Sequence, residues 1–123
     1  YYTPKPVVSF MCREGLKGYL RAQLPNENEP VIAHFVDSYD ATQLSDAEAT
    51  LRALQRVTVC DPACGSGAYL LGMMQELLLL RQALFTSRNV DPRSMYDRKL
   101  EIIQNNISGV DNDPFATNIA QLR

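Results

Sequence analysis

A glycine-rich turn at residues 61–67 carries the clearest chemical signal in this sequence. It consists of Asp-Pro-Ala-Cys-Gly-Ser-Gly and follows Val57–Cys60, an apolar, β-branched run that predicts a buried parallel strand. Residues 68–86 then predict a long buried helix. A glycine turn at such a junction lets a ligand approach the backbone and meet the free amides of the helix N-terminus. The sequence therefore predicts a ligand-binding turn, with Gly65 and Gly67 nearest the ligand.

The residues around this turn narrow the class of ligand. A dinucleotide-binding turn has a third glycine where this chain has Leu70, and an acid roughly 20 residues later. A phosphate-binding P-loop needs a lysine after its last glycine, and here Ala68 follows. What remains is a ligand with an adenosine part and little need for phosphate neutralisation. Asp111, after a second predicted strand at 107–110, is placed to accept hydrogen bonds from a ribose diol. An ordinary strand-to-helix turn, and a helix-capping role for Asp111, are the alternatives.

Metal sites are not predicted. Asp111-Asn112-Asp113 resembles the start of a calcium loop, but Ala116 stands where that loop needs glycine for its sharp turn. A zinc site would lack ligands, because Cys60 and Cys64 have only His34 elsewhere to join them.

Three segments of the chain together resemble a known family. Residues 61–67 resemble motif I of S-adenosylmethionine-dependent amino methyltransferases that act on DNA adenine. Tyr2-Thr3-Pro4 resembles their motif X, and residues 109–114, Gly-Val-Asp-Asn-Asp-Pro, resemble motif II. The order X, I, II is that of the type I and type IIG restriction-modification and phage-defence methyltransferases. The resemblance spans nearly the whole chain and implies S-adenosyl-L-methionine as cofactor and DNA as partner.

The resemblance also implies a role for each matching residue. Asp61 and the 63–67 turn would contact the methionine part of the cofactor, with Tyr2 and Thr3 closing over it. Asp111 would hold the ribose, and Asn112 would flank the adenine ring. The family commonly has an aliphatic residue at this position. Asn112 packs less apolar surface against a purine than an aliphatic residue would, but its backbone amide is still present. The implied cofactor-binding residues are Tyr2, Thr3, Pro4, Asp61, Ala63, Cys64, Gly65, Ser66, Gly67, Asp111 and Asn112.

The family's catalytic loop does not occur in this sequence. That loop is Asn/Asp-Pro-Pro-aromatic, which accepts the amino protons of a flipped adenine and stacks on its ring, and the chain has no Pro-Pro pair. We therefore expect the catalytic residues beyond Arg123, with any target-recognition or nuclease region. Methylation of RNA, protein or another amine, and a non-catalytic scaffold role, remain as alternatives.

The order of predicted elements indicates an α/β fold, specifically the N-terminal, incomplete part of a Rossmann-like doubly wound parallel sheet. Residues 1–123 would form the cofactor-binding part of one methyltransferase domain. Before the glycine-rich turn we expect a helix at 4–24, a polar connector at 25–30, and a short strand or ordered loop at 31–39. A further helix is opened by a capping box at Ser45–Glu48. After the turn we expect a helix opened by Asp91-Pro92 and ended by Asn105-Asn106, and a last helix from residue 112.

Composition agrees with one ordinary domain, or part of one. The chain has 123 residues, 46% of them hydrophobic, and a formal net charge of -2, so it offers no basic surplus typical of a nucleic-acid surface. Doubly wound α/β enzymes usually need roughly twice this length. An odd count of three cysteines without a secretory signal favours a reducing, cytoplasmic compartment. The most apolar stretch is too short for a membrane span, and the sequence gives no signal for an oligomeric state.

Overall fold

The computed structural model describes residues 4–59 and 67–107. Its elements are the α-helices α1 (Lys5–Gln23), α2 (Glu29–Ser38), α3 (Ala47–Arg56), α4 (Ala68–Arg88) and α5 (Met95–Glu101), followed directly by a π-helical turn, η1 (Ile102–Ile107). Within these residues the chain is helical and contains no strand.

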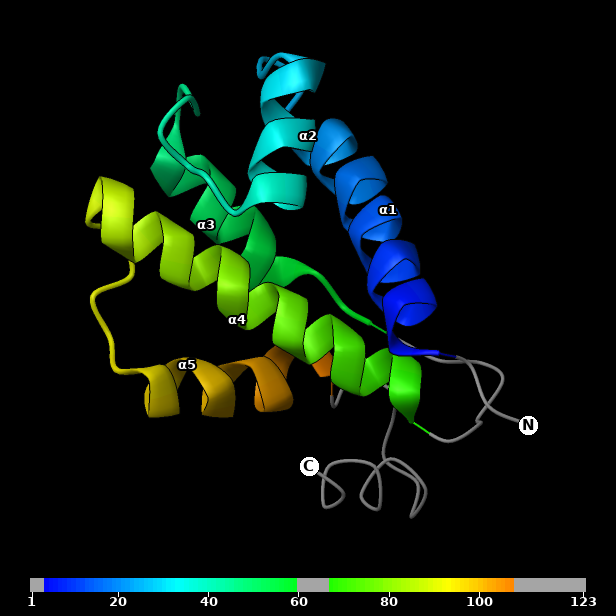
Figure 1. Cartoon of the computed structure of the whole chain (residues 1–123). Helices are drawn as coiled ribbons and strands as arrows, with labels where there is room; N and C mark the ends of the chain where they lie inside the picture. Colours follow the sequence, from blue (N-terminus) through cyan, green and yellow to red (C-terminus); the bar gives the residue numbers. More distant parts are fainter. Residues whose placement is uncertain (1–3, 60–66, 108–123) are drawn as a thin grey trace.

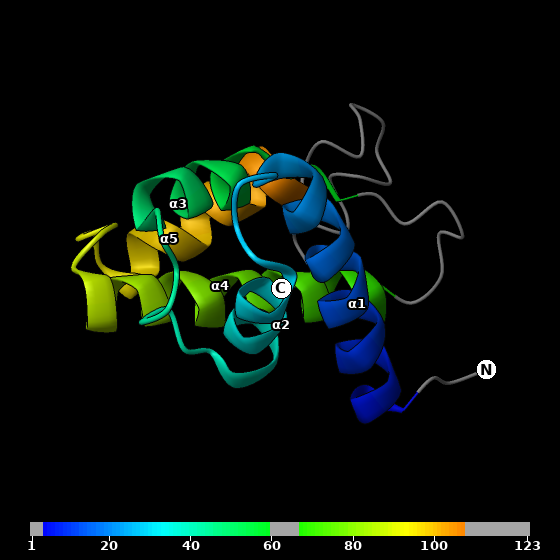
Figure 2. The ribbon, with the colours of Figure 1, turned by 90° about the horizontal axis from the view of Figure 1, so that it is seen from above.

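Helix α4 lies at the centre and packs against α1, α3, α5 and η1. In Figure 1, α1, α2 and α3 lie on one side of α4, whereas α5 and η1 lie on the other. In Figure 2, seen from above, α3 covers α5 along one flank of α4, and α2 lies along the opposite flank. Two spacing patterns explain this arrangement. The larger apolar side chains that are buried in α1 recur every four residues along one face, whereas those in α4 alternate steps of three and four. They are Val8, Cys12, Leu16 and Leu20 in α1, and Leu70, Met73, Leu77, Leu80 and Leu84 in α4.

The predicted helices at 4–24 and 68–86 are confirmed to within two residues. Pro4 precedes the first helical residue of α1, and its carbonyl accepts from the amides of Val7 and Val8 at 3.0 and 3.1 Å. Helix α3 is also confirmed, but the cap differs from the prediction. The Asp46 carboxylate, rather than the Ser45 hydroxyl, accepts from the Ala49 amide at 2.9 Å. Ser45 instead donates through its amide and hydroxyl to Glu27.

The segment 31–39, expected as a short strand or loop, is helical: residues 31–38 belong to α2 and Tyr39 is its C-cap. Ile32, Phe35 and Val36 are buried at the one-face spacing of a helix. Glu29 in the first turn favours the helix through its charge, and Tyr39 ends it in the left-handed conformation at φ 54°.

The predicted parallel sheet is wrong for the described residues. Val57 and Val59 are buried as expected of a strand, and Val57 has extended angles. However, a strand requires hydrogen-bonded neighbours along its length. The described residues provide this segment with one backbone hydrogen bond to another element, from the Val59 amide to the Asn106 carbonyl at 2.8 Å. Ile107, the expected start of the second strand, belongs to η1, and residues 60 and 108–110 lie outside the described ranges.

The helix predicted from Asp91 begins later, at Met95, with Ser94 accepting from the Asp97 amide at 3.1 Å as its cap. Asp91 itself is 4% exposed and has a left-handed backbone, φ 60°. Asn105 and Asn106 do not end the helical run, which continues as η1 to Ile107. The expected last helix, from residue 112, lies outside the described residues.

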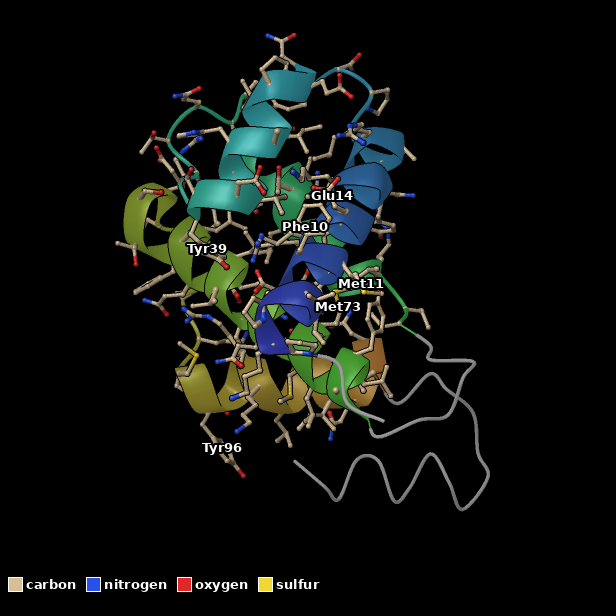
Figure 3. All side chains as sticks on the ribbon, turned by 45° about the vertical axis from the view of Figure 1, so that its right-hand side comes forward. Phe10, Met11, Glu14, Tyr39, Met73 and Tyr96 are labelled. Atoms are coloured by element: carbon tan, nitrogen blue, oxygen red, sulfur yellow. The ribbon has the colours of Figure 1, made fainter. Side chains whose placement is uncertain are left out.

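Large apolar side chains also remain at the surface, among them Phe10 and Met11 on the outer side of α1 and Tyr96 on α5, which points away from the molecule in Figure 3. No helix in the described part of the chain combines the length and apolar character required to cross a membrane.

Candidate functional site

The structure describes both ends of the glycine-rich turn. Val57–Val59 leads into it, and Gly67 ends it as the residue that precedes α4. Gly67 has φ 85° and ψ 0°, a left-handed conformation that glycine adopts without the steric cost of a side chain. Its carbonyl accepts from the Leu71 amide at 2.9 Å, which begins the helix. The first turn of α4 contains no acidic residue, and the N-terminal end of a helix carries a partial positive charge.

A cavity of about 250 Å³ lies beside these two ends. Its wall combines α1, the extended segment and the first turns of α4, with lining residues Gly15, Leu16, Tyr19, Val57, Thr58, Val59, Tyr69 and Met73. The volume is somewhat below the roughly 300 Å³ at which pockets for whole small ligands begin. The described residues therefore form space for part of such a ligand.

The Tyr19 hydroxyl in the cavity wall is already engaged. It donates to the Ala53 carbonyl of α3 at 2.8 Å, and burial raises the pKa of this phenol. Tyr19 consequently remains neutral and acts as a fixed wall that links α1 to α3, rather than as an acid or base.

A buried polar group links α1 to α4. Glu76 is 3% exposed, accepts from the Tyr39 hydroxyl at 2.8 Å and lies 3.8 Å from the Arg13 guanidinium. Burial and, secondly, the Glu76 charge raise the pKa of the Cys12 thiol to about 11. Since only a thiolate is a good nucleophile, Cys12 is a packing residue. Its thiol is buried and forms no disulfide.

No group of three or more histidine, cysteine, aspartate or glutamate side chains that could hold a metal ion occurs among the described residues. His34 instead pairs with Asp40 at 2.8 Å between Nε2 and Oδ2.

Of the predicted cofactor residues, the structure describes Pro4 and Gly67. Each immediately precedes a helix, α1 and α4 respectively. The early turns of these two helices touch, because a Cβ on Gly72 would lie 2.9 Å from Val8 Cγ1. The helices that follow the two segments resembling motifs X and I are therefore packed together. The other predicted residues lie outside the described ranges: Tyr2, Thr3, Asp61, Ala63, Cys64, Gly65, Ser66, Asp111 and Asn112.

Comparison with known proteins gives the family. Residues 38–123 match the MmeI DNA-methyltransferase domain, and this stretch includes both the glycine-rich turn and Asp111. The chain belongs to the MmeI DNA-methyltransferase domain family.

A curated relative from Methanocaldococcus jannaschii, described as a putative type II restriction enzyme and methyltransferase, is 31% identical over 134 aligned residues. The alignment covers all of this chain and 11% of the relative. The chain thus spans about a tenth of the length of this relative. No solved structure matches the chain.

Proposed function

We propose that this chain is the S-adenosyl-L-methionine-binding part of a DNA methyltransferase that transfers a methyl group to the exocyclic amine of adenine, in a restriction-modification or phage-defence system. The observation that carries the proposal is the family match over 38–123, because the matched stretch contains the glycine-rich turn that resembles motif I. The relative from Methanocaldococcus jannaschii, described as a putative type II restriction enzyme and methyltransferase, supports the same class of protein.

The described residues are compatible with such a cofactor. Gly67 supplies a left-handed turn that glycine adopts at low cost, and the positive end of the α4 dipole suits the carboxylate of an amino acid. The adjacent cavity has tyrosine and aliphatic walls, a surface suited to part of a nucleoside. When bound, the cofactor supplies an activated methyl group on a sulfonium.

The remaining roles follow the family resemblance. Asp61 and the 63–67 turn hold the methionine part, Tyr2 and Thr3 cover it, and Asp111 accepts from the ribose. The base-flipping and catalytic residues belong to an Asn/Asp-Pro-Pro-aromatic loop, which this sequence does not contain. We expect that loop, and the contacts with DNA, in the full protein to which this domain belongs.

Calorimetric titration of the full protein with S-adenosyl-L-methionine tests the cofactor. We expect binding by the wild type, loss of binding in Gly65→Asp, which places a charged side chain where the backbone meets the ligand, and a loss of about tenfold or more in Asp111→Ala, which removes two hydrogen bonds. Gly18→Asp is the matched control, because a Cβ at Gly18 would meet nothing within 4 Å. A wild type that does not bind contradicts the cofactor assignment.

Methyl transfer to adenine-containing duplex DNA tests the substrate. Radiolabelled methyl incorporation should appear in the full protein and depend on adenine in the duplex. Cofactor binding without DNA methylation would instead favour RNA, protein or another amine as substrate. Absence of both would favour a non-catalytic scaffold.

A further inference from the structure

Asn106 joins three parts of the structure at one point. It lies in η1 and is fully buried, at 0% exposure. Its side-chain Nδ2 donates to the carbonyls of Leu54 at 3.1 Å and Gln55 at 3.3 Å, and also to the carbonyl of Val57. Its own main-chain carbonyl accepts from the Val59 amide at 2.8 Å. One residue thus holds the end of α3 and both ends of the extended segment that follows it.

The π-helical winding of η1 brings Asn106 to this place. The buried residues of η1 are Ile102, Asn106 and Ile107. Asn106 and Ile107 follow Ile102 by four and five residues, which matches the wider turn of a π-helix. Such turns are rare in proteins, and those that occur often lie at functional sites. Ile102 and Ile107 join the apolar core, and Asn106 is the one polar side chain of η1 among the buried set.

Stability alone is a poor explanation for this asparagine. Within the described residues its Oδ1 is buried without a hydrogen-bond partner, which is costly for an amide oxygen. The final carbonyls of a helix can also be satisfied by solvent or by a left-handed glycine. What Asn106 adds is a fixed path for residues 57–59. Its side-chain amide holds the Val57 carbonyl, and its backbone carbonyl holds the Val59 amide.

That path leads directly to the ligand-binding turn. Val59 stands two residues before Asp61, and the other end of the turn is fixed by Gly67 and α4. Binding sites need their groups held to within about 0.5 Å of the productive geometry. We propose that Asn106 is a positioning residue for cofactor binding: it fixes residues 57–59, which form part of the cavity wall and lead into the 61–67 turn. This inference rests on the proposed function.

Cofactor titration of three Asn106 variants in the full protein tests this role. Asn106→Asp has nearly the same shape but turns an acceptor toward three carbonyls. Asn106→Leu removes the donors, and Asn106→Ser keeps one donor on a shorter side chain. We expect the Kd for S-adenosyl-L-methionine to rise at least about tenfold in the first two variants and less in Asn106→Ser, as for the loss of one or more buried hydrogen bonds. In steady-state assays, KM for the cofactor should rise while kcat at saturation changes little.

Leu84→Ala is the matched structural control. Leu84 is fully buried, toward the other end of α4 from the turn, so this variant should lower thermal stability while leaving the Kd within about twofold of wild type. The inference would be overturned if Asn106→Asp and Leu84→Ala have similar thermal midpoints and Asn106→Asp raises the Kd for the cofactor no more than Leu84→Ala does. If Asn106→Asp does not fold, an unchanged Kd in Asn106→Ser overturns it equally. If the wild-type protein does not bind cofactor, the proposed function itself is wrong. Failure of the Asn106 inference and failure of the proposed function are therefore distinguishable.

Discussion

At the scale of single residues, the contact between α1 and α4 depends on a glycine. Gly72 lies inside α4, where glycine costs about 1 kcal/mol relative to alanine. A Cβ at this position would lie 2.9 Å from Val8 Cγ1 and 3.3 Å from Cys12 Sγ. Valine is stiff at χ1, so Val8 cannot easily move aside. The close approach explains why glycine stands here despite its low helix propensity.

We therefore expect Gly72→Ala to lower stability by about 1 kcal/mol, because overpacking costs of about 1–3 kcal/mol exceed the gain in helix propensity. Gly18→Ala in α1 is the opposite case. A Cβ there meets nothing within 4 Å, so this variant should gain up to about 1 kcal/mol. Thermal unfolding followed by circular dichroism compares the two. Stabilisation by both substitutions would mean that α1 and α4 pack less closely than the structure indicates.

Between elements, a buried ionic network ties α4 to α5. Arg81, fully buried in α4, donates to Asp91 at 2.8 and 3.2 Å and to Glu101 at 2.6 Å. Arg93 also donates to both carboxylates, and Arg98 donates to the Asp91 carbonyl at 2.7 Å. Burial by itself would raise the pKa of Asp91, but the hydrogen bonds and charges of Arg81 and then Arg93 outweigh it and lower that pKa.

Asp91→Asn tests this network with little change in shape, since asparagine tolerates the left-handed backbone at this position. Removing one partner of a buried pair costs about 3–5 kcal/mol, so we expect a loss of that order at pH 7 in denaturant unfolding. Because the folded pKa of Asp91 is depressed, its stabilisation is complete above the unfolded pKa of about 3.9 and is lost as pH falls through the folded pKa.

The difference between wild type and Asp91→Asn should therefore shrink below about pH 4. Asp97→Asn on the exposed side of α5 is the control, with an expected loss below about 1 kcal/mol. Equal effects of the two substitutions, or a difference that does not vary with pH, would rule out the network as the main link between α4 and α5.

The elements also differ in how far the sequence could predict them. Helices α1 and α4 were predictable because long apolar periodicity and clear start signals agree. The segment 31–39 was ambiguous because a short apolar run fits helix and strand equally. The strand at 57–60 was predicted from residue types, but a strand depends on neighbours that local sequence does not specify. Asn106 was expected to end a helix, and its contacts lie 49 to 52 residues away along the chain, where no local pattern indicates them. All of the predicted cofactor-binding residues stay predictions, Pro4 and Gly67 as well as those in the 1–3, 60–66 and 108–123 ranges.

Across the whole molecule, the helices do not share the core equally. Helix α4 packs against α1, α3, α5 and η1, whereas the main partner of α2 is α1. Opening α4 therefore requires disruption of the whole core, and opening α2 does not. Hydrogen exchange of the full protein should show the slowest amides in the middle of α4, around Leu77 and Leu80, with α2 exchanging at least about tenfold faster, a difference of about 1.4 kcal/mol.

Cofactor should alter this pattern at one end of the molecule. The proposed site adjoins the early turns of α4 and the extended segment 57–59, both of which line the cavity, while α2 contributes none of its lining. A ligand that binds only the folded site suppresses local opening there in proportion to its saturation. We expect saturating S-adenosyl-L-methionine to slow exchange in peptides covering 57–59 and 68–73, and to leave α2 unchanged. Protection spread evenly over all helices would indicate general stabilisation, and protection confined to α2 would place the ligand elsewhere.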